Sequence, residues 1–405
     1  MTFVTKKNIT YAVLFLTIVS FTHVYAQDKD TVKSTSNKPL IGHGSKGFEF
    51  NSRDGNYLLQ IQFRGQFRAA YPTDSDPIEL SDFQEEQLYL RVNRARMKIG
   101  GHAFNPFLKY YVEYDFFGAN MLDFRLMLDK LPYLKLKVGQ WKVHYTRERV
   151  ISSGKQQTVE RSIINRPFTI DRQQGVSLYG RLNGPGLADF NYWVSVLMGT
   201  GRGARENDDK NPMIMTRWQW NFMGEPLEFT GSDLTYHKKF VGIIALAGVT
   251  NRSPFTRFST SGGGQLVGFE EGVAGQYRVN QLLAETAGKY RGFSWQQELH
   301  WKEINDKVNI TTNTLMGNLF QLGYFPHYTW KKFPKKMEFY ARHAFYDPNV
   351  QEESDFQQEL STGFNWFFKG HANKLTVEYS YLYYSIETDQ LKEGSRVRLQ
   401  WDVSF

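Results

Sequence analysis

The last ten residues of the chain alternate between apolar and polar side chains without a break. The apolar members are Val397, Leu399, Trp401, Val403 and Phe405, and the polar members are Arg396, Arg398, Gln400, Asp402 and Ser404. A β-strand turns successive side chains to opposite faces, so this segment has one apolar face and one polar face. Such a strand suits a wall between lipid and water, which makes a transmembrane β-barrel the first fold to consider.

The same two-residue period recurs along most of the chain and predicts an all-β, antiparallel transmembrane β-barrel of about sixteen strands. The expected strands span residues 57–68, 86–102, 106–117, 120–130, 134–143, 173–182, 187–198, 212–223, 239–250, 277–289, 293–304, 314–328, 335–346, 356–369, 373–385 and 395–405. The weakest alternation is in 212–223 and 277–289, and 281–287 also has helical propensity. A barrel of about sixteen strands leaves a water-filled lumen, so the strand count predicts a channel.

The N-terminus has the order of a secretory signal peptide. Lys6 and Lys7 precede a short apolar run, and Ala26 ends a small-residue cleavage site. An N-terminal membrane anchor is the alternative, although polar residues follow at once. We expect a cleaved signal peptide over 1–26, a flexible periplasmic lead-in over 27–50 and the barrel over 51–405, in the outer membrane of a Gram-negative bacterium.

The composition agrees with an exported barrel. Aromatic residues make up 16% of the chain, as the aromatic girdles of membrane barrels require, although the mean hydropathy of −0.50 is polar. The chain has no Cys, so its stability must come from a hydrogen-bonded framework and not from disulfides. No segment after the signal peptide is apolar for the length of a helical span, which excludes a helical membrane protein.

The connections between the expected strands are asymmetric. If the N-terminus lies in the periplasm, the periplasmic turns are mostly tight and rich in Asn, Gly and Pro. The extracellular connections 69–85, 144–172, 199–211 and 251–276 are long and polar. This asymmetry is typical of outer-membrane barrels. The periplasmic connection 224–238 is longer than the others and leaves room for a strand missed in the count.

Three cations, Arg94, Arg96 and Lys98, share one face of the second expected strand. A cation on the lipid face costs roughly 2–4 kcal/mol near mid-bilayer, so we expect all three to face the lumen. There they would form a ladder of positive charge that draws anions through the pore. The alternative is neutralisation by carboxylates on the lumen face of neighbouring strands. These are Glu113, Asp115 and Asp123.

Other strands add cations to the same expected lumen face. They are Arg64 and Arg68 on the first strand, Lys135 and Lys137 on 134–143, and Arg396 and Arg398 on the last. We expect the last strand to close the barrel against the first, which would bring Arg396 and Arg398 towards Arg64 and Arg68 in one basic lumen.

The long connection 144–172 could fold into the lumen and narrow it. Its cations are Arg147, Arg149, Lys155, Arg161, Arg166 and Arg172, and its acids are Glu148, Glu160 and Asp171. The excess of cations would bias such a constriction towards anions. A solvated surface loop, or a loop that contacts lipopolysaccharide, is the alternative.

The sequence gives no support to catalysis. It contains no nucleophile-elbow, zinc-protease or P-loop motif, and its nine His are scattered without metal-ligand spacing. We therefore expect no enzyme activity, no cofactor and no metal, and the export signal argues against nucleic-acid binding.

At three stretches the chain resembles the phosphate-selective porin O and P family: 94–101, 111–116 and 136–142, with support from 160–166 and the aromatic last strand. The resemblance implies a sixteen-stranded outer-membrane porin, usually trimeric, with a folded-in third loop and a basic lumen for small anions. It also implies recognition of the terminal Phe405 by the barrel-assembly machinery. The family's best-known members carry a longer arginine ladder and a lysine cluster, and this chain matches only part of that pattern.

The main hypothesis is thus a passive porin that prefers anions, surrounded by outer-membrane lipid and lipopolysaccharide. One alternative is a barrel without a channel, either an adhesin or an embedded hydrolase, which would need a plugged lumen or a catalytic constellation. A soluble secreted β-sandwich is the other.

Overall fold

The computed structural model describes residues 40–78, 80–84, 86–258, 263–352, 355–385 and 392–405. All of them belong to one compact unit, Lys38–Phe405. The predicted signal peptide lies outside the described residues.

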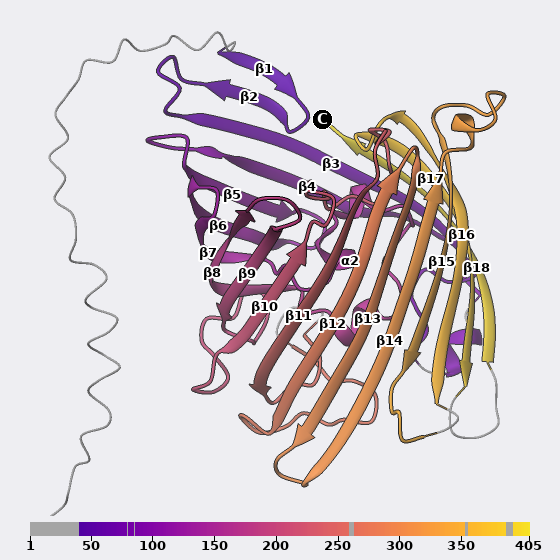
Figure 1. Cartoon of the computed structure of the whole chain (residues 1–405). Coiled ribbons are helices and arrows are strands. Elements are labelled where there is room, and N and C mark those ends of the chain that lie inside the picture. The colour runs from indigo at the N-terminus through magenta and orange to yellow at the C-terminus, as the bar shows by residue number, and fades with distance from the viewer. Residues whose placement is uncertain (1–39, 79, 85, 259–262, 353–354, 386–391) are drawn as a thin grey trace, which may run out of the picture. The chain divides into compact units, whose positions relative to one another are not determined.

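Sixteen antiparallel strands, β3 to β18, form a closed barrel (Figure 1). Their bounds are β3 Leu58–Tyr71, β4 Tyr89–His102, β5 Leu108–Asp115, β6 Asn120–Leu131, β7 Leu134–Lys142, β8 Arg172–Asn183, β9 Asp189–Leu197, β10 Met213–Trp220, β11 Val241–Ser253, β12 Tyr277–Tyr290, β13 Phe293–Asp306, β14 Thr311–Tyr324, β15 Met337–Asp347, β16 Phe356–Lys369, β17 Asn373–Ser385 and β18 Lys392–Ser404. The sixteen-strand prediction is therefore confirmed. The helical alternative within β12 is wrong, because neighbouring strands pair with it along its whole length.

The barrel closes where the last strand meets the first. β18 pairs with β3 in a register that sets Gln400 opposite Arg68 and Asp402 opposite Gln66. The terminal residue extends this seam, since the backbone of Phe405 exchanges two hydrogen bonds of 2.8 and 3.0 Å with Phe63. The predicted closure of the barrel at this point is confirmed.

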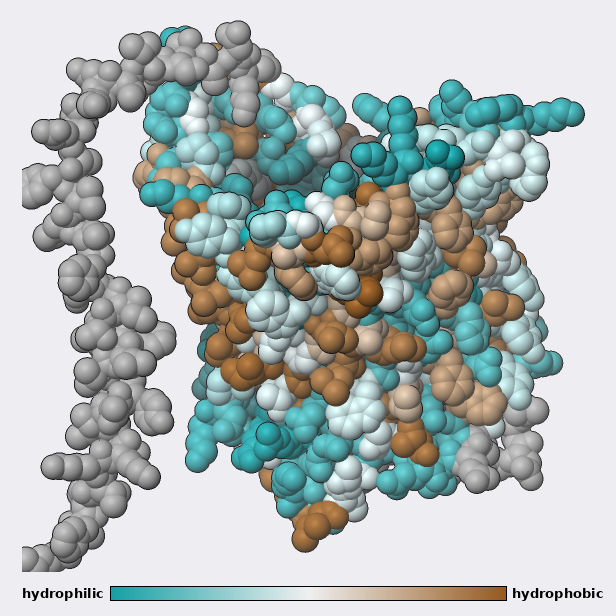
Figure 2. Space-filling view, in the orientation of Figure 1, coloured by the Kyte–Doolittle hydropathy of each residue, from teal (hydrophilic) through white to brown (hydrophobic). Residues whose placement is uncertain are grey.

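The alternation of β18 has the expected physical meaning. Its apolar members are 42–51% exposed at Val397, Leu399 and Trp401, whereas Arg398 and Asp402 are 1% exposed or less. The apolar side chains gather in a band around the face of the molecule shown in Figure 2, with hydrophilic residues towards both ends. Strand after strand thus turns an apolar face outwards and a polar face into the lumen.

One end of the barrel carries the connections 72–88, 143–171, 198–212 and 254–276, which we call the loop end. The other end, the turn end, has mostly short turns, with 221–240 and 325–336 as exceptions. No strand occurs within 221–240, all of whose residues are described, so the strand count missed nothing there.

A hairpin of β1 (Ile41–Gly44) and β2 (Gly47–Asn51) precedes the barrel. β2 continues the sheet by pairing with residues 58–61 of β3, beyond the part of β3 that β18 covers. Of the expected lead-in over 27–50, residues 27–39 lie outside the described residues, and residues 41–50 belong to this hairpin. The hairpin covers the sheet edge that the first half of β3 would otherwise leave free.

The helices are short. They are the 3₁₀ helices η1 (Leu80–Gln84), η2 (Ser153–Lys155) and η3 (Pro326–Tyr328) and the single-turn helices α2 (Arg147–Val150) and α3 (Asn165–Phe168). None of the described helices is long and apolar enough to cross a bilayer.

Candidate functional site

The connection between β7 and β8, residues 143–171, lies inside the ring of strands, and we call it the lumen loop (Figure 1). Three strand carboxylates accept hydrogen bonds from its backbone. Glu148 N–H donates to Glu298 Oε1 over 2.6 Å, Val159 N–H to Glu378 Oε2 over 3.0 Å, and Ile163 N–H to Glu359 Oε2 over 3.0 Å. The alternative of a solvated surface loop is thus excluded.

Strand cations bind the carbonyls of the same loop. Lys302 donates to Pro167 O over 2.7 Å, Arg342 to Glu160 O over 2.7 Å, and Lys374 to Gln156 O over 2.6 Å. Buried backbone groups need such partners, since leaving them unpaired in the lumen would cost free energy. The wall formed by β10–β17 therefore holds the lumen loop with its own charges.

Two cations of the lumen loop bind backbone carbonyls, one within the loop itself and one in the segment 221–240. Arg161 donates to Ile151 O over 2.8 Å, and Arg147 donates to Glu228 O over 2.5 Å. Both guanidinium groups are buried. The prediction that they line a constriction needs correction, because backbone carbonyls of the loop and of the segment 221–240 need donors and bind these guanidinium groups.

The other cations expected in this region differ in their surroundings. Arg149 donates to Asp171 over 2.7 Å and Arg172 to Asp123 over 2.6 Å, so both are neutralised. Lys155 is exposed, and Arg166 is partly exposed.

The connection 221–240 is long because its extra residues fold against the base of the lumen loop. Gly231 N–H donates to Lys155 O over 3.2 Å, and the Phe229 ring lies 5.6 Å from His144. Lys289 on β12 fixes the segment by donating to Ser232 O over 2.9 Å. The lumen loop is thus supported from the turn end as well as from the wall.

A cavity of about 560 Å³ opens at the turn end, and we call it the inner cavity. Six cationic side chains line it, and no carboxylate of the described residues does so. They are Lys46, Arg64, Lys98, Lys109, Arg125 and Lys155. Three of these, Lys46, Lys98 and Lys155, make no hydrogen bond or ion pair within 4.0 Å through their ammonium groups to any described residue.

A second cavity of about 540 Å³, the outer cavity, opens at the loop end. Its charges nearly balance. Its cations are Arg68, Arg91, Arg94, Arg166 and Arg398, and its acids are Asp74, Asp76, Glu160 and Asp355. The excess of positive charge is therefore concentrated at the turn end.

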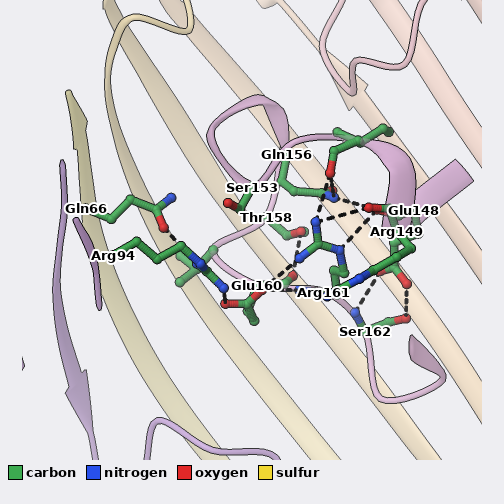
Figure 3. Close-up of polar contacts among 12 residues, drawn as sticks. Gln66, Arg94, Glu148, Arg149, Ser153, Gln156, Thr158, Glu160, Arg161 and Ser162 are labelled. Carbon is green, nitrogen blue, oxygen red and sulfur yellow. Dashed lines mark hydrogen bonds and ion pairs between the residues drawn. The ribbon is translucent and has the colours of Figure 1, made fainter. Parts of the chain in front are cut away.

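The predicted ladder on β4 is divided between paired and unpaired cations. Arg96 donates to Asp115 over 2.9 Å and to Glu113 over 3.3 Å, as the neutralisation alternative foresees. Arg94 donates to Gln66 and to Glu160 of the lumen loop, each over 2.7 Å (Figure 3). Lys98 is the member of this ladder whose ammonium group has no hydrogen-bond or ion-pair partner among the described residues.

The cations at the seam point inwards, but carboxylates neutralise them. Arg64 pairs with Asp402 at 2.9 Å, Arg68 with Asp74 at 2.9 Å, and Arg396 with Asp76 at 2.6 Å. Arg398 pairs with Glu378. The predicted union of these residues into one basic pathway therefore needs correction, because each shares its charge with an acid.

The two cations predicted on β7 also have partners. Lys135 pairs with Asp129 at 2.5 Å. Lys137 is buried, and its ammonium lies 4.6 Å from the centre of the Tyr179 ring. Cation–π contacts of this kind stabilise a lysine whose ammonium has no carboxylate of the described residues within 4.0 Å.

Sequence reasoning missed Lys46 and Lys142. Lys46 lies in the turn of the β1–β2 hairpin, inside the expected flexible segment, and the glycines at 44 and 47 on either side were the available signal. Lys142 is opposite Arg172 in the β7–β8 register. Strict alternation would set Lys142 on the face opposite Lys135 and Lys137, but the backbone departs from a regular strand at Gly139, with φ of +121°.

No three His, Asp or Glu side chains in the described part of the chain gather closely enough to hold a metal ion. The geometry thus offers a cavity of more than 500 Å³ at each end of a charged lumen, and residues of the lumen loop line both cavities.

Comparison with known proteins gives the class of this channel. The model of the phosphate-selective porin O and P family matches residues 63–405, so the β1–β2 hairpin lies outside the match. No curated protein matches the chain.

Several solved structures share the fold. An anion-selective porin from Comamonas acidovorans aligns over 86% of this chain and 100% of its own, with a TM-score of 0.57 and 10% identity. The outer membrane channel DcaP of Acinetobacter baumannii aligns over 88% and 99%, with a TM-score of 0.55 and 12% identity. The trimer form of OmpT from Vibrio cholerae aligns over 86% and 99%, with a TM-score of 0.54 and 9% identity.

At such identities the likeness establishes the fold alone, which is that of outer membrane porins. The family match adds the class, a channel and not an enzyme. The chain belongs to the phosphate-selective porin O and P family and is a porin of the outer membrane.

Proposed function

We propose that this porin passes small anions, phosphate among them, in preference to cations. The observation that carries the proposal is the inner cavity, where six cations face the same space and no carboxylate of the described residues lines it. Arg64, Lys109 and Arg125 pair with acids that do not line the cavity, whereas Lys46, Lys98 and Lys155 have no ion pair to a described residue. Unpaired charges inside a low-dielectric wall raise the local concentration of counter-ions.

The lumen loop lies beside this charge, because charged side chains of the β10–β17 wall bind its backbone. It contacts Arg64 on β3 through Ser153, whose hydroxyl accepts a hydrogen bond over 3.0 Å. A permeating ion would then pass between the lumen loop and the wall formed by β4–β7. On that route the free ammonium groups of Lys98 and Lys155 lie within reach, whereas the acids Glu113 and Asp115 are bound to Arg96.

The remaining sequence-predicted roles fit this proposal. Arg166 would attract anions at the outer cavity. Lys135, Lys137, Arg396 and Arg398 would act on the electrostatic potential of the lumen and not as direct contacts.

Reversal potentials in a potassium chloride gradient across planar bilayers test the proposal. The wild-type protein should show anion preference, and the double variant Lys98→Gln with Lys155→Gln should lose much of it. The matched control is Lys331→Gln with Lys332→Gln, which removes the same charge from exposed residues of the β14–β15 connection. Cation preference in the wild-type protein, or an equal change in both double variants, would contradict the proposal.

We further propose export by a signal peptide cleaved after Ala26, insertion by the barrel-assembly machinery through the terminal Phe405, and a homotrimer in contact with lipid and lipopolysaccharide. The trimer form of OmpT is the supporting neighbour for the assembly. Native mass spectrometry of the detergent-extracted protein should give three chains of the mature mass. A monomer that does not begin at Gln27 would contradict both the assembly and the cleavage.

A further inference from the structure

Glu160 is a carboxylate of the lumen loop that three arginines share. Its Oε2 accepts from Arg94 over 2.7 Å, and its Oε1 accepts from Arg161 over 3.4 Å (Figure 3). Its Oε2 also accepts from Arg68 over 3.1 Å. Burial opposes its ionisation, but Arg94 and Arg68 outweigh this and hold the pKa of the Glu160 carboxyl well below its usual range. Arg68 also pairs with Asp74 at 2.9 Å, so Glu160 is the carboxylate that all three guanidinium groups share, and Asp74 binds Arg68 from the other side of the cluster.

The three arginines do not depend on Glu160 for their positions. Arg94 also donates to Gln66 Oε1 over 2.7 Å, and Arg68 to Gln400 Oε1 over 2.7 Å. Arg161 donates to Ile151 O over 2.8 Å. If the Glu160 carboxylate moved away, the guanidinium groups would stay in place as a preorganised set of donors.

The lumen loop does not depend on the Glu160 side chain either. The backbone around residue 160 is held by Arg342, which donates to Glu160 O over 2.7 Å and to Thr158 Oγ1 over 2.9 Å. Val159 N–H donates to Glu378. The carboxylate is therefore a side chain that can leave its partners without releasing the loop.

The location of the carboxylate is suited to exchange with a solute. Glu160 lines the outer cavity together with Arg68 and Arg94. Its side chain is 25% exposed, whereas that of Arg68 is 2% exposed and that of Arg94 is 15% exposed. A solute in the outer cavity would reach the carboxylate first and the guanidinium groups behind it.

We propose that Arg68, Arg94 and Arg161 form an oxyanion-binding site that Glu160 occupies as a tethered counter-ion. A small oxyanion with several acceptor oxygens, such as phosphate or a carboxylate, displaces the Glu160 side chain and takes over its hydrogen bonds. Guanidinium groups suit this exchange because they bind phosphate and carboxylate oxygens in the same way. The inference rests on the proposed passage of anions and deepens it, since Glu160 sets how tightly the passing anion is held.

The test compares Glu160→Gln with Glu271→Gln in planar bilayers. Both variants remove one negative charge, but Glu271 is an exposed residue of the 254–276 connection. Inorganic phosphate is titrated into a potassium chloride bath, and the half-blocking concentration for the chloride current is measured. With the internal competitor removed, Glu160→Gln should lower this concentration roughly tenfold, because the competent state is then fully populated. Glu160→Asp, which keeps the charge, should behave like the wild-type protein.

An equal half-blocking phosphate concentration in Glu160→Gln and Glu271→Gln would overturn the inference. A larger chloride conductance in Glu160→Gln without tighter phosphate block would overturn it too, since Glu160 would then only tie the loop to the wall. Heat-modifiable migration in gels establishes that each variant is folded. The wild-type reversal potential tests the proposed function separately, and a wild-type protein without anion preference would contradict that function. The comparison of the two variants tests the role of Glu160.

Discussion

Inward-facing cations have different partners on the two walls of this barrel. On the β10–β17 wall, four buried cations, each 1% exposed or less, donate to backbone carbonyls of the lumen loop, and two of them also bind strand carboxylates. They are Arg217, Lys302, Arg342 and Lys374. On the β3–β7 wall, Arg64 and Arg94 also bind the lumen loop, but Lys98 faces the inner cavity without an ion pair within 4.0 Å to a described residue. The contrast teaches that the number of lumen cations does not predict selectivity, because half of the lumen uses them to hold a loop.

The largest effect on stability is expected from removing a cation by which the β10–β17 wall holds the lumen loop. Arg342→Gln would leave Glu359 and Glu148 buried without their shared partner. Removing one member of a buried ion pair typically costs about 3–5 kcal/mol. Urea unfolding in detergent micelles, followed by Trp fluorescence, should show a free energy of unfolding lower by this amount. Arg53→Gln, at an exposed arginine, is the control, and equal stability of the two variants would refute the anchoring role.

A smaller effect is expected where the lumen loop touches the opposite wall. An added Cβ at Gly154 would lie 2.8 Å from Cζ of Arg64, a contact that something must relieve. Overpacking of this kind costs about 1–3 kcal/mol. Gly154→Ala should therefore lower both the free energy of unfolding and the single-channel conductance. In the control Gly65→Ala the added Cβ lies 3.4 Å from the Phe67 ring, an ordinary contact, and a loss as large as that of Gly154→Ala would contradict close packing of the loop against Arg64.

The smallest effect concerns the ladder itself. Arg96→Gln would release Asp115 and would leave Glu113 with Arg172, 3.8 Å away, as its remaining ion-pair partner, whereas Lys98→Gln removes one cation and releases no paired acid among the described residues. We expect the anion-to-cation permeability ratio to fall several-fold in Arg96→Gln, and by less in Lys98→Gln. Reversal potentials measure both. A greater loss in Lys98→Gln would mean that the paired acids stay shielded without Arg96.

The strands could be predicted from the sequence because lipid and water impose their pattern on every second residue. Val397, Leu399 and Trp401 are exposed on the outer face for this reason, and the closing contact between β18 and β3 follows from it. The orientation of Lys142 was not predicted because the irregular backbone at Gly139 shifts the alternation. No local signal in the sequence marks which glycine will do so.

The loop and its charges could not be predicted in the same way. Whether Arg161 faces a pathway or a carbonyl depends on the folded position of Ile151 O. Whether the loop enters the lumen depends on Glu378, which lies 219 residues from its partner Val159. Such contacts leave no periodic trace in the sequence. The sequence therefore indicated which cations face inwards, and only the fold separates those with partners from those without.

Anomalous diffraction from crystals soaked in bromide tests the difference between the two walls most directly. Bromide is a monovalent anion whose positions can be located without reference to a model of the solvent. We predict bromide sites in the inner cavity beside Lys98 and Lys155, and none beside Arg217 or Arg342. Bromide bound equally along both walls, or absent from the inner cavity, would contradict the account.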